Sequence, residues 1–287
     1  MPYLYLAIAV LGSSGVSIAS GYFARKTVGK KGAQPAFLLM ETAFIFLAWT
    51  VMYLANPSFD LGVLPYSVGF GAFLVFALTG SIKAISNGSV AMTALVNQSS
   101  MIAVSVWGLL FWGEVFTWQT GVGLVLVLVA LCLCLMPGKG EGVSVTGKWL
   151  LFATMLFVGN AGASIVQRSE QMAFQGAHGN MLMCFALLIG VAYGVINFLR
   201  SDRSQTREVV RAGGVWPVLA GGANVAMNVA VILLATTTLP ASLIYPAISI
   251  GGLAFSTLYS RFVFGERLSA VQWLGMGLGV TATLLLA

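Results

Sequence analysis

Charge is what this sequence has least of. Only 8% of its 287 residues are Asp, Glu, Lys or Arg, whereas a soluble domain carries about a quarter. Hydrophobic residues make up 59% of the chain, and its mean hydropathy is +0.94. This small number of polar groups cannot cover the surface of a water-soluble globular protein. The composition therefore excludes a soluble protein and indicates that lipid is the solvent.

Histidine and cysteine are also scarce, which limits metal and redox chemistry. The only histidine is His178, and the three cysteines (Cys132, Cys134 and Cys184) lie inside apolar runs without CxxC spacing. The chain has no G-x-S-x-G motif and no phosphate-binding loop, and its carboxylates are too scattered for paired acid–base catalysis. We therefore expect a protein that is not an enzyme and that binds no metal ion or cofactor.

Long apolar runs dominate what remains. A membrane-spanning helix needs about 20 mostly apolar residues, and runs without a two-residue alternation favour helices over a barrel. The sequence predicts an all-α integral membrane protein with ten spans, at 3–23, 35–55, 66–85, 88–112, 117–136, 147–167, 178–199, 215–236, 240–264 and 270–287.

An internal repeat organises these spans. GSSGVSIAS at 12–20 recurs as GNAGASIVQ at 159–167, and the 27 residues ending at Glu114 align without a gap with those ending at Glu266. The repeat predicts two five-helix halves, and it makes the first span retained structure rather than a signal peptide. Because five is odd, the halves are expected to be inverted in the membrane, a common plan of secondary transporters. The predicted parts are 1–137, a cytoplasmic linker at 138–146, and 147–287.

The basic residues predict the orientation. If the N-terminus lies outside, every Lys and Arg except Arg168 falls in a predicted cytoplasmic loop, as the positive-inside rule requires. Both termini are therefore expected outside. The net charge of +6 is divided among these loops and forms no continuous patch with aromatic groups, so we expect no nucleic-acid partner.

With its ten spans and inverted halves, the chain resembles the drug/metabolite transporter superfamily, in its EamA-like branch, over essentially its whole length. The residues that carry this resemblance are the two Gly-Glu pairs, each followed by a Gln and a Gly: Glu114, Gln119 and Gly121, and Glu266, Gln272 and Gly275. The resemblance implies a multi-pass carrier in the bacterial inner (plasma) membrane that moves small metabolites, often outward, by alternating access. It also implies a cavity between helices 1–4 and 6–9. Members commonly keep both termini in the cytoplasm, and the charge bias here departs from that habit.

The Gly-Glu pairs are expected to be structural. Gly113 and Gly265 suit the left-handed position that ends a helix. A carboxylate just ahead of the next helix is favoured by the helix dipole, and Ser269 with Gln272 has the spacing of a capping box.

Polar side chains inside the spans are the candidate substrate site, because each is costly in lipid. Thr93, Asn97, Ser100, Val104 and Trp107 share one helix face, and a matching stripe follows 152 residues later. Packing between helices remains the alternative explanation. The candidate substrate-binding residues are Ser13, Ser17, Thr93, Asn97, Ser100, Trp107, Asn160, Ser164, Asn224, Asn228, Tyr245 and Ser249.

Glu41 is the one acidic residue placed well inside a predicted span. Two interpretations stay open: a proton-coupling group, or a salt bridge near the surface with Lys83 or with the basic cluster from Arg25 to Lys31.

The expected cavity is uncharged, rich in hydroxyl groups and aromatic. This favours a small neutral or zwitterionic metabolite, such as an amino acid or a nucleoside, carried by an exporter. Two alternatives are a proton-coupled exporter of organic cations or drugs, and a flippase for lipid-linked substrates. The expected partners are this small molecule and the lipid bilayer, and a second copy of the chain in a homodimer is a further candidate.

Overall fold

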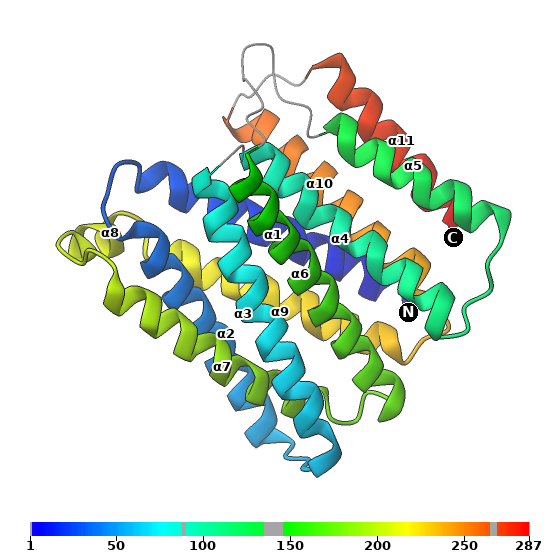
Figure 1. The fold of residues 1–287 in the computed structure, drawn as a ribbon, viewed down its shortest axis with the longest axis horizontal. Helices are drawn as coiled ribbons and strands as arrows, with labels where there is room; N and C mark the ends of the chain where they lie inside the picture. Colours follow the sequence, from blue (N-terminus) through cyan, green and yellow to red (C-terminus); the bar gives the residue numbers. More distant parts are fainter. Residues whose placement is uncertain (1, 88–89, 135–145, 265–268, 287) are drawn as a thin grey trace. The chain divides into compact units, whose positions relative to one another are not determined.

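The computed structural model describes residues 2–87, 90–134, 146–264 and 269–286, and within these ranges every regular element is a helix (Figure 1). A 3-10 turn, η1 (Leu61–Val63), precedes the third helix, and a short helix, α8 (Thr206–Gly213), follows the seventh. The long helices are α1 (Pro2–Lys26), α2 (Ala33–Ala55), α3 (Leu64–Asn87), α4 (Val90–Phe111), α5 (Trp118–Cys134), α6 (Gly147–Ala173), α7 (Gly179–Arg200), α9 (Val215–Ala235), α10 (Ala241–Phe264) and α11 (Ala270–Leu286).

Each predicted span holds one long helix, so the all-α prediction is confirmed. Two details differ. Helix α6 continues past the predicted end at 167 to Ala173, and α8 lies where only a loop was expected. The α8 segment carries three charged residues in eight and buries little besides Val209, so it does not register as an apolar run. The linker predicted at 138–146 falls, apart from Thr146, outside the described residues.

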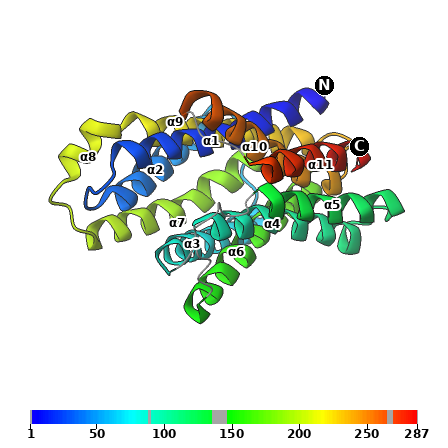
Figure 2. The ribbon, with the colours of Figure 1, turned by 90° about the horizontal axis from the view of Figure 1, so that it is seen from above.

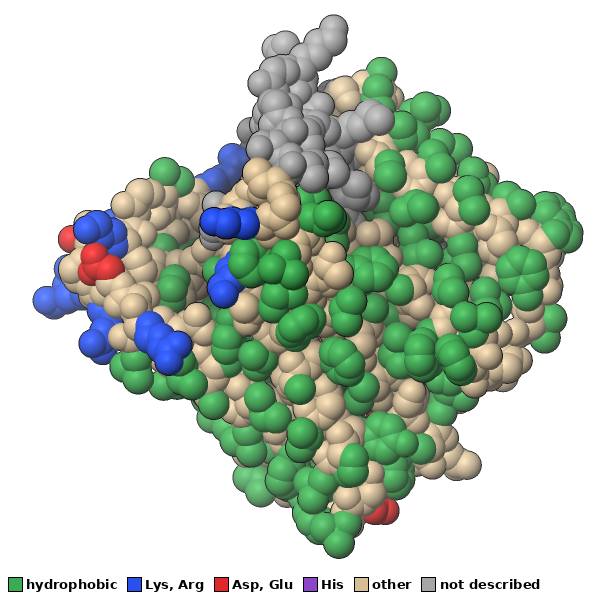
Figure 3. Space-filling model, viewed as in Figure 1, with side chains coloured by type: hydrophobic (Ala, Val, Ile, Leu, Met, Phe, Trp, Pro, Cys, Tyr) green, Lys and Arg blue, Asp and Glu red, His purple; other side chains and the backbone are tan. Residues whose placement is uncertain are grey.

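Seven helices of the described chain are long and apolar enough to cross a membrane, rather than the ten expected: α1, α2, α3 with η1, α6, α7, α9 and α10. The apolar stretches of α4 and α5 are shorter, at Val96–Phe111 and Trp118–Leu133. Exposed hydrophobic side chains cover much of the face drawn in Figure 3, and a group of charged side chains gathers near α8. These helices indicate a multi-pass membrane protein.

The chain divides into two compact units. The first unit holds residues 3–72 and 169–236, and the second holds residues 73–168 and 237–287. In the first unit α2 packs antiparallel on α7: the Asn180 amide donates to the Met52 carbonyl (3.5 Å), and Gly194, further along α7, touches Thr42. Helix α1 packs on α9 at Gly12, where a Cβ atom would lie 2.7 Å from the Ala223 carbonyl oxygen.

The second unit has helix contacts of its own. Helix α4 packs antiparallel on α10, and Gln98 and Ser249 exchange two hydrogen bonds: the Gln98 amide donates to the Ser249 carbonyl, and the Ser249 hydroxyl donates to the Gln98 carbonyl, each at 3.1 Å. Helices α5 and α11 lie side by side in Figures 1 and 2 and share an apolar cluster with Val127 and Ala282. Helix α6 packs on α3 at Gly159, which backs onto Ala77.

Candidate functional site

Three of the predicted site residues meet in the second unit. The Asn160 side-chain amide on α6 donates to the Asn97 side-chain oxygen (3.1 Å), the Asn97 carbonyl (3.3 Å) and the Ser100 hydroxyl (2.9 Å) on α4. Ser100 is buried, and the two asparagines are half-buried. Because amide groups in an apolar environment require partners, these bonds explain how α4 and α6 hold three polar residues between two apolar helices. We call Asn97, Ser100 and Asn160 the amide cluster.

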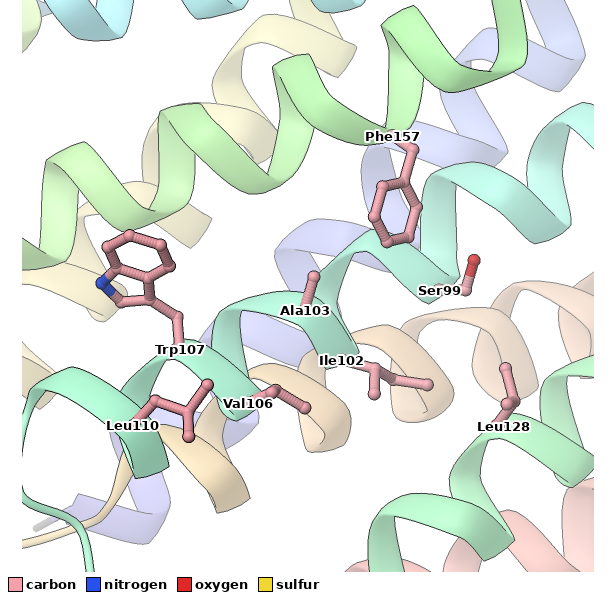
Figure 4. Close-up of a pocket in the computed structure, with 8 residues that line it drawn as sticks. All are labelled: Ser99, Ile102, Ala103, Val106, Trp107, Leu110, Leu128 and Phe157. Carbon is pink, nitrogen blue, oxygen red and sulfur yellow. The ribbon is translucent and has the colours of Figure 1, made fainter. Parts of the chain in front are cut away.

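A cavity of about 490 Å³ is lined by residues of α4, α5 and α6, and the three residues of the amide cluster are not among them. Phe157 precedes Asn160 by about one turn of α6, and Ser99 adjoins Ser100 on α4. Figure 4 shows the Trp107 ring extending from α4 and the Phe157 ring pointing from α6 toward α4. The cavity is lined by Ser99, Ile102, Ala103, Val106, Trp107, Leu110, Leu128 and Phe157.

This lining is more apolar than the sequence led us to expect. Trp107 is the one predicted site residue in it, and Ser99 supplies its one side-chain hydroxyl. Together with the amide cluster, the arrangement offers an aromatic and aliphatic wall next to uncharged hydrogen-bonding groups. Such a lining resembles that of a small-molecule site, where a few polar groups orient a mostly apolar contact.

Other predicted residues of the second unit hold helices together. The Trp149 indole nitrogen donates to the Thr93 hydroxyl (3.1 Å) at a buried contact, and Ser249 is bonded to Gln98 as described above. Tyr245 is buried in the cluster of Val104, Ala161 and Ala241. Its hydroxyl has no hydrogen-bond partner in the described part of the chain. Ser164 lies half-buried on α6.

The remaining predicted residues belong to the first unit. The Ser17 hydroxyl donates to the Ser13 carbonyl within α1 (3.3 Å). The Asn228 side-chain amide donates to the Asn224 side-chain oxygen (2.9 Å) one turn earlier on α9. The structure therefore brings the predicted residues together in part: the amide cluster is one group, and these pairs are separate local contacts.

Glu41 lies half-buried on α2. Within the described ranges it makes no ion pair. Lys30 instead pairs with Glu208 (3.2 Å) and Lys31 with Asp202 (3.3 Å), while the Lys83 ammonium lies 5.2 Å from the centre of the Phe152 ring. No described contact supports the salt bridge, and both interpretations of Glu41 stay predictions.

The structural role predicted for Glu114 is confirmed, but its carboxylate caps a different helix from the one expected. Gly113 has a left-handed φ of 71° and follows the last turn of α4, as predicted. The Glu114 carboxylate then accepts hydrogen bonds from the backbone N–H groups of Ala241 and Ser242, the first two residues of α10 rather than α5. Its partner is 127 residues away in sequence, so no local pattern indicates it.

The second Gly-Glu pair, Gly265 and Glu266, lies outside the described residues. The capping box after this pair is confirmed. The Gln272 backbone N–H donates to the Ser269 hydroxyl (3.2 Å), and the Ser269 backbone N–H donates to the Gln272 side-chain oxygen (2.9 Å).

The sequence analysis missed two polar residues in the last turn of α6. Glu170 and Gln171 are buried, with exposed fractions of 0% and 1%. The predicted span ends at residue 167, where the polar run QRSEQ begins, whereas the helix continues through that run. Among the described residues, no group of three His, Cys, Asp or Glu side chains is placed to hold a metal ion.

Comparisons with known proteins give a likeness in fold. No family model matches the chain, and no curated protein matches it. A solved structure described as "Crystal structure of protein" is similar in fold with a TM-score of 0.72, over 99% of this chain and 95% of that chain. The sequence identity is 15%, so this similarity shows a shared fold and nothing about activity.

Proposed function

We propose that this protein is a secondary transporter that moves a small neutral or zwitterionic metabolite across the membrane by alternating access. The observation that carries the proposal is the pair of reciprocal hydrogen bonds between Gln98 and Ser249. At the repeat offset of 152, the counterpart of Gln98 is residue 250, the neighbour of Ser249. Equivalent positions of two antiparallel helices thus lie opposite each other. This places a local two-fold axis perpendicular to the two helices, as inverted repeats require.

The other helices support the same inverted plan. In this proposal α1 to α5 correspond to α6, α7, α9, α10 and α11, with α8 as an insertion, and ten spans result. Helices α2, α4 and α5 each pack on their counterpart. Gly12 and Gly159, which correspond at the offset of 147, both press against the third helix of the other half.

The substrate class follows from the amide cluster and from the cavity that residues of the same two helices, α4 and α6, help to line. Amide and hydroxyl groups bind a neutral or zwitterionic polar group by hydrogen bonds, and the Trp107 and Phe157 rings suit an apolar portion. An amino acid with an apolar side chain, or a nucleoside, has both features. The motif resemblance to the EamA-like branch of the drug/metabolite transporters supports export across a bacterial inner membrane.

Transport by the purified protein in liposomes tests the proposal. Radiolabelled leucine, phenylalanine and uridine are offered, with tetraphenylphosphonium as the organic cation. We expect saturable uptake of at least one neutral or zwitterionic solute. Transport of tetraphenylphosphonium alone would favour the alternative of a cation exporter, and no uptake of any solute would contradict the proposal.

Asn160→Ala locates the site, because it removes the donor that joins the amide cluster. We expect a several-fold rise in KM for the transported solute. Thr154→Ala is the matched control: Thr154 is exposed on the same helix, and its hydroxyl donates to the Leu150 carbonyl of its own turn (2.9 Å). Equal KM values for the two variants would remove the amide cluster from the site.

A further inference from the structure

The last turn of α6 holds a carboxylate that is sealed from solvent and has no hydrogen-bond partner among the residues that the structure describes. Neither oxygen of Glu170 accepts a hydrogen bond from any described residue, and the Gln171 side chain beside it makes none either. An ionised carboxylate in such a place loses its hydration without compensation, which is strongly unfavourable. Polar groups at membrane depth that carry this cost are usually functional.

The backbone around Glu170 is fully engaged, so the isolation concerns the side chains. The Phe174 N–H donates to the Glu170 carbonyl, and the Gly176 N–H donates to the Gln171 carbonyl, both at 2.9 Å. Gln175 and Gly176 have left-handed φ values of 53° and 75°, and this turn leads directly into α7. The chain ends α6 in a regular way and nevertheless buries two polar side chains there.

The groups around this end of α6 supply no counter-charge. Phe174 packs against the rings of Tyr66 and His178, with centroids 6.1 and 5.4 Å apart, and the His178 Nδ1 atom also lacks a partner. Asp60, at the start of η1, uses its carboxylate to accept from the Gly62 N–H (2.7 Å).

Two further elements complete the surroundings of this turn. Helix α9 carries no charged residue, and its Ile232 lies next to Gly179, while Thr236, just past its end, lies next to Gly176. On α6 itself the nearest base is Arg168, and residues two positions apart do not face each other on a helix. The buried Nε atom of Arg168 also lacks a hydrogen-bond partner in the described chain, and Glu170 makes no salt bridge there.

We propose that Glu170 is the proton-binding site of this transporter. The carboxylate forms one O–H bond with a proton that enters from water on one side, and it breaks that bond when the proton leaves on the other side. A metal cation would need several oxygen ligands, whereas a proton needs the carboxylate alone. This inference rests on the proposed transport function, and it assigns the coupling role to Glu170 in place of Glu41.

A spectroscopic experiment tests proton binding without any substrate. Infrared difference spectra of the lipid-reconstituted protein are recorded between acidic and alkaline pH for the wild type, Glu170→Gln and Glu208→Gln. We expect the carbonyl band of a protonated buried carboxyl in the wild type and in Glu208→Gln, whose native carboxylate is exposed and paired with Lys30. Glu170→Gln should lose that band, and its persistence there would overturn the proposal.

A transport experiment tests coupling. Solute exchange at equal pH is compared with uptake driven by a pH gradient, with radiolabelled leucine, phenylalanine and uridine as probes. Glu170→Gln should retain exchange and lose the accumulation that the gradient drives, while Glu170→Asp, which keeps a carboxyl group, should retain part of it. Accumulation by Glu170→Gln at the wild-type level would overturn the proposal. If the wild type transports none of these solutes, the transport function fails, and the infrared result still decides whether Glu170 binds a proton.

Discussion

Asp202 lies in the exposed loop after α7, where two neighbours stabilise its charged form. The Ser204 N–H donates to one carboxylate oxygen (3.0 Å), and the Lys31 ammonium lies 3.3 Å from the other. The hydrogen bonds from Ser204, followed by Lys31, lower the pKa of Asp202 from 3.8 to about 2. The ionised side chain thereby ties the α1–α2 loop to the loop that precedes α8.

The first prediction concerns the acid dependence of this contact. Because the pKa of Asp202 is lowered on folding, its stabilisation is fully present above its ordinary value of 3.8 and is lost as the pH falls toward about 2. The difference in melting temperature between the wild type and Asp202→Asn should stay constant from about pH 5 to 8 and shrink below about pH 4. Thermal unfolding in detergent across this range checks it, and a difference that grows on acidification would refute it.

The carboxylate of Glu114, like that of Asp202, accepts backbone hydrogen bonds, and here it caps the start of α10. Glu114→Ala leaves the first two N–H groups of α10 without their acceptors, so we expect a loss of roughly 0.5–2 kcal/mol in the free energy of unfolding. Glu114→Gln keeps one acceptor and loses the charge, and its effect should be smaller. The neighbouring exposed Gln119 supplies the control, Gln119→Ala. Chemical unfolding should rank the three losses in that order, and equal losses would contradict a capping role.

At the scale of the helices, close approach depends on single glycines. A Cβ atom on Gly159 would meet the backbone of α3, and one on Gly12 would meet the backbone of α9, whereas one on Gly277 in α11 would meet nothing within 4 Å. We predict that Gly12→Ala and Gly159→Ala each destabilise by about 1–3 kcal/mol. Gly277→Ala should be neutral, or stabilising by up to about 1 kcal/mol. Unfolding measurements on the three variants check this, and equal effects would show that the contacts tolerate a methyl group.

Helix α8 presents exposed Arg207 and Arg211 to water and buries Val209. Basic residues next to a membrane attract anionic lipids, by about 1 kcal/mol for each residue. We predict that phosphatidylglycerol raises the melting temperature more than phosphatidylcholine does, and that Arg203→Gln/Arg207→Gln/Arg211→Gln reduces this difference. Lys83→Gln/Lys148→Gln removes two basic residues from other predicted cytoplasmic loops and should reduce it less than the triple variant does. A full lipid effect in the triple variant would contradict the prediction.

The sequence predicted elements better than contacts, for physical reasons. Apolar runs placed all ten long helices, because lipid exposure demands them whatever their neighbours. The end of α6 was wrong, since burial by other helices lets a polar turn such as 167–171 stay helical. The polar stripe on the fourth span supplied Asn97 and Ser100 of the amide cluster, and the polar residues of the sixth span supplied Asn160. It could not find the partner of Glu114, because that contact joins distant parts of the chain.

For the whole molecule, the basic residues predict which side faces the cytoplasm. In a variant without native cysteines, Phe59→Cys should react with a membrane-impermeant maleimide from outside the cell, and Ser204→Cys only after permeabilisation. Both positions lie in short exposed or half-exposed loops of the first unit. The reverse pattern would show that the chain is inserted with its termini in the cytoplasm, the orientation common in the family it resembles.

The bond between Glu114 and the start of α10 also constrains biosynthesis. The ribosome releases Glu114 127 residues before Ala241, so at about 5–20 residues per second the two groups are separated by roughly 6–25 s. Helices α2, α4 and α5 likewise cannot pack on α7, α10 and α11 until those later helices have been synthesised. These three helices must therefore remain in the bilayer without these partners, and their contacts with α7, α10 and α11 form only after those helices have been translated.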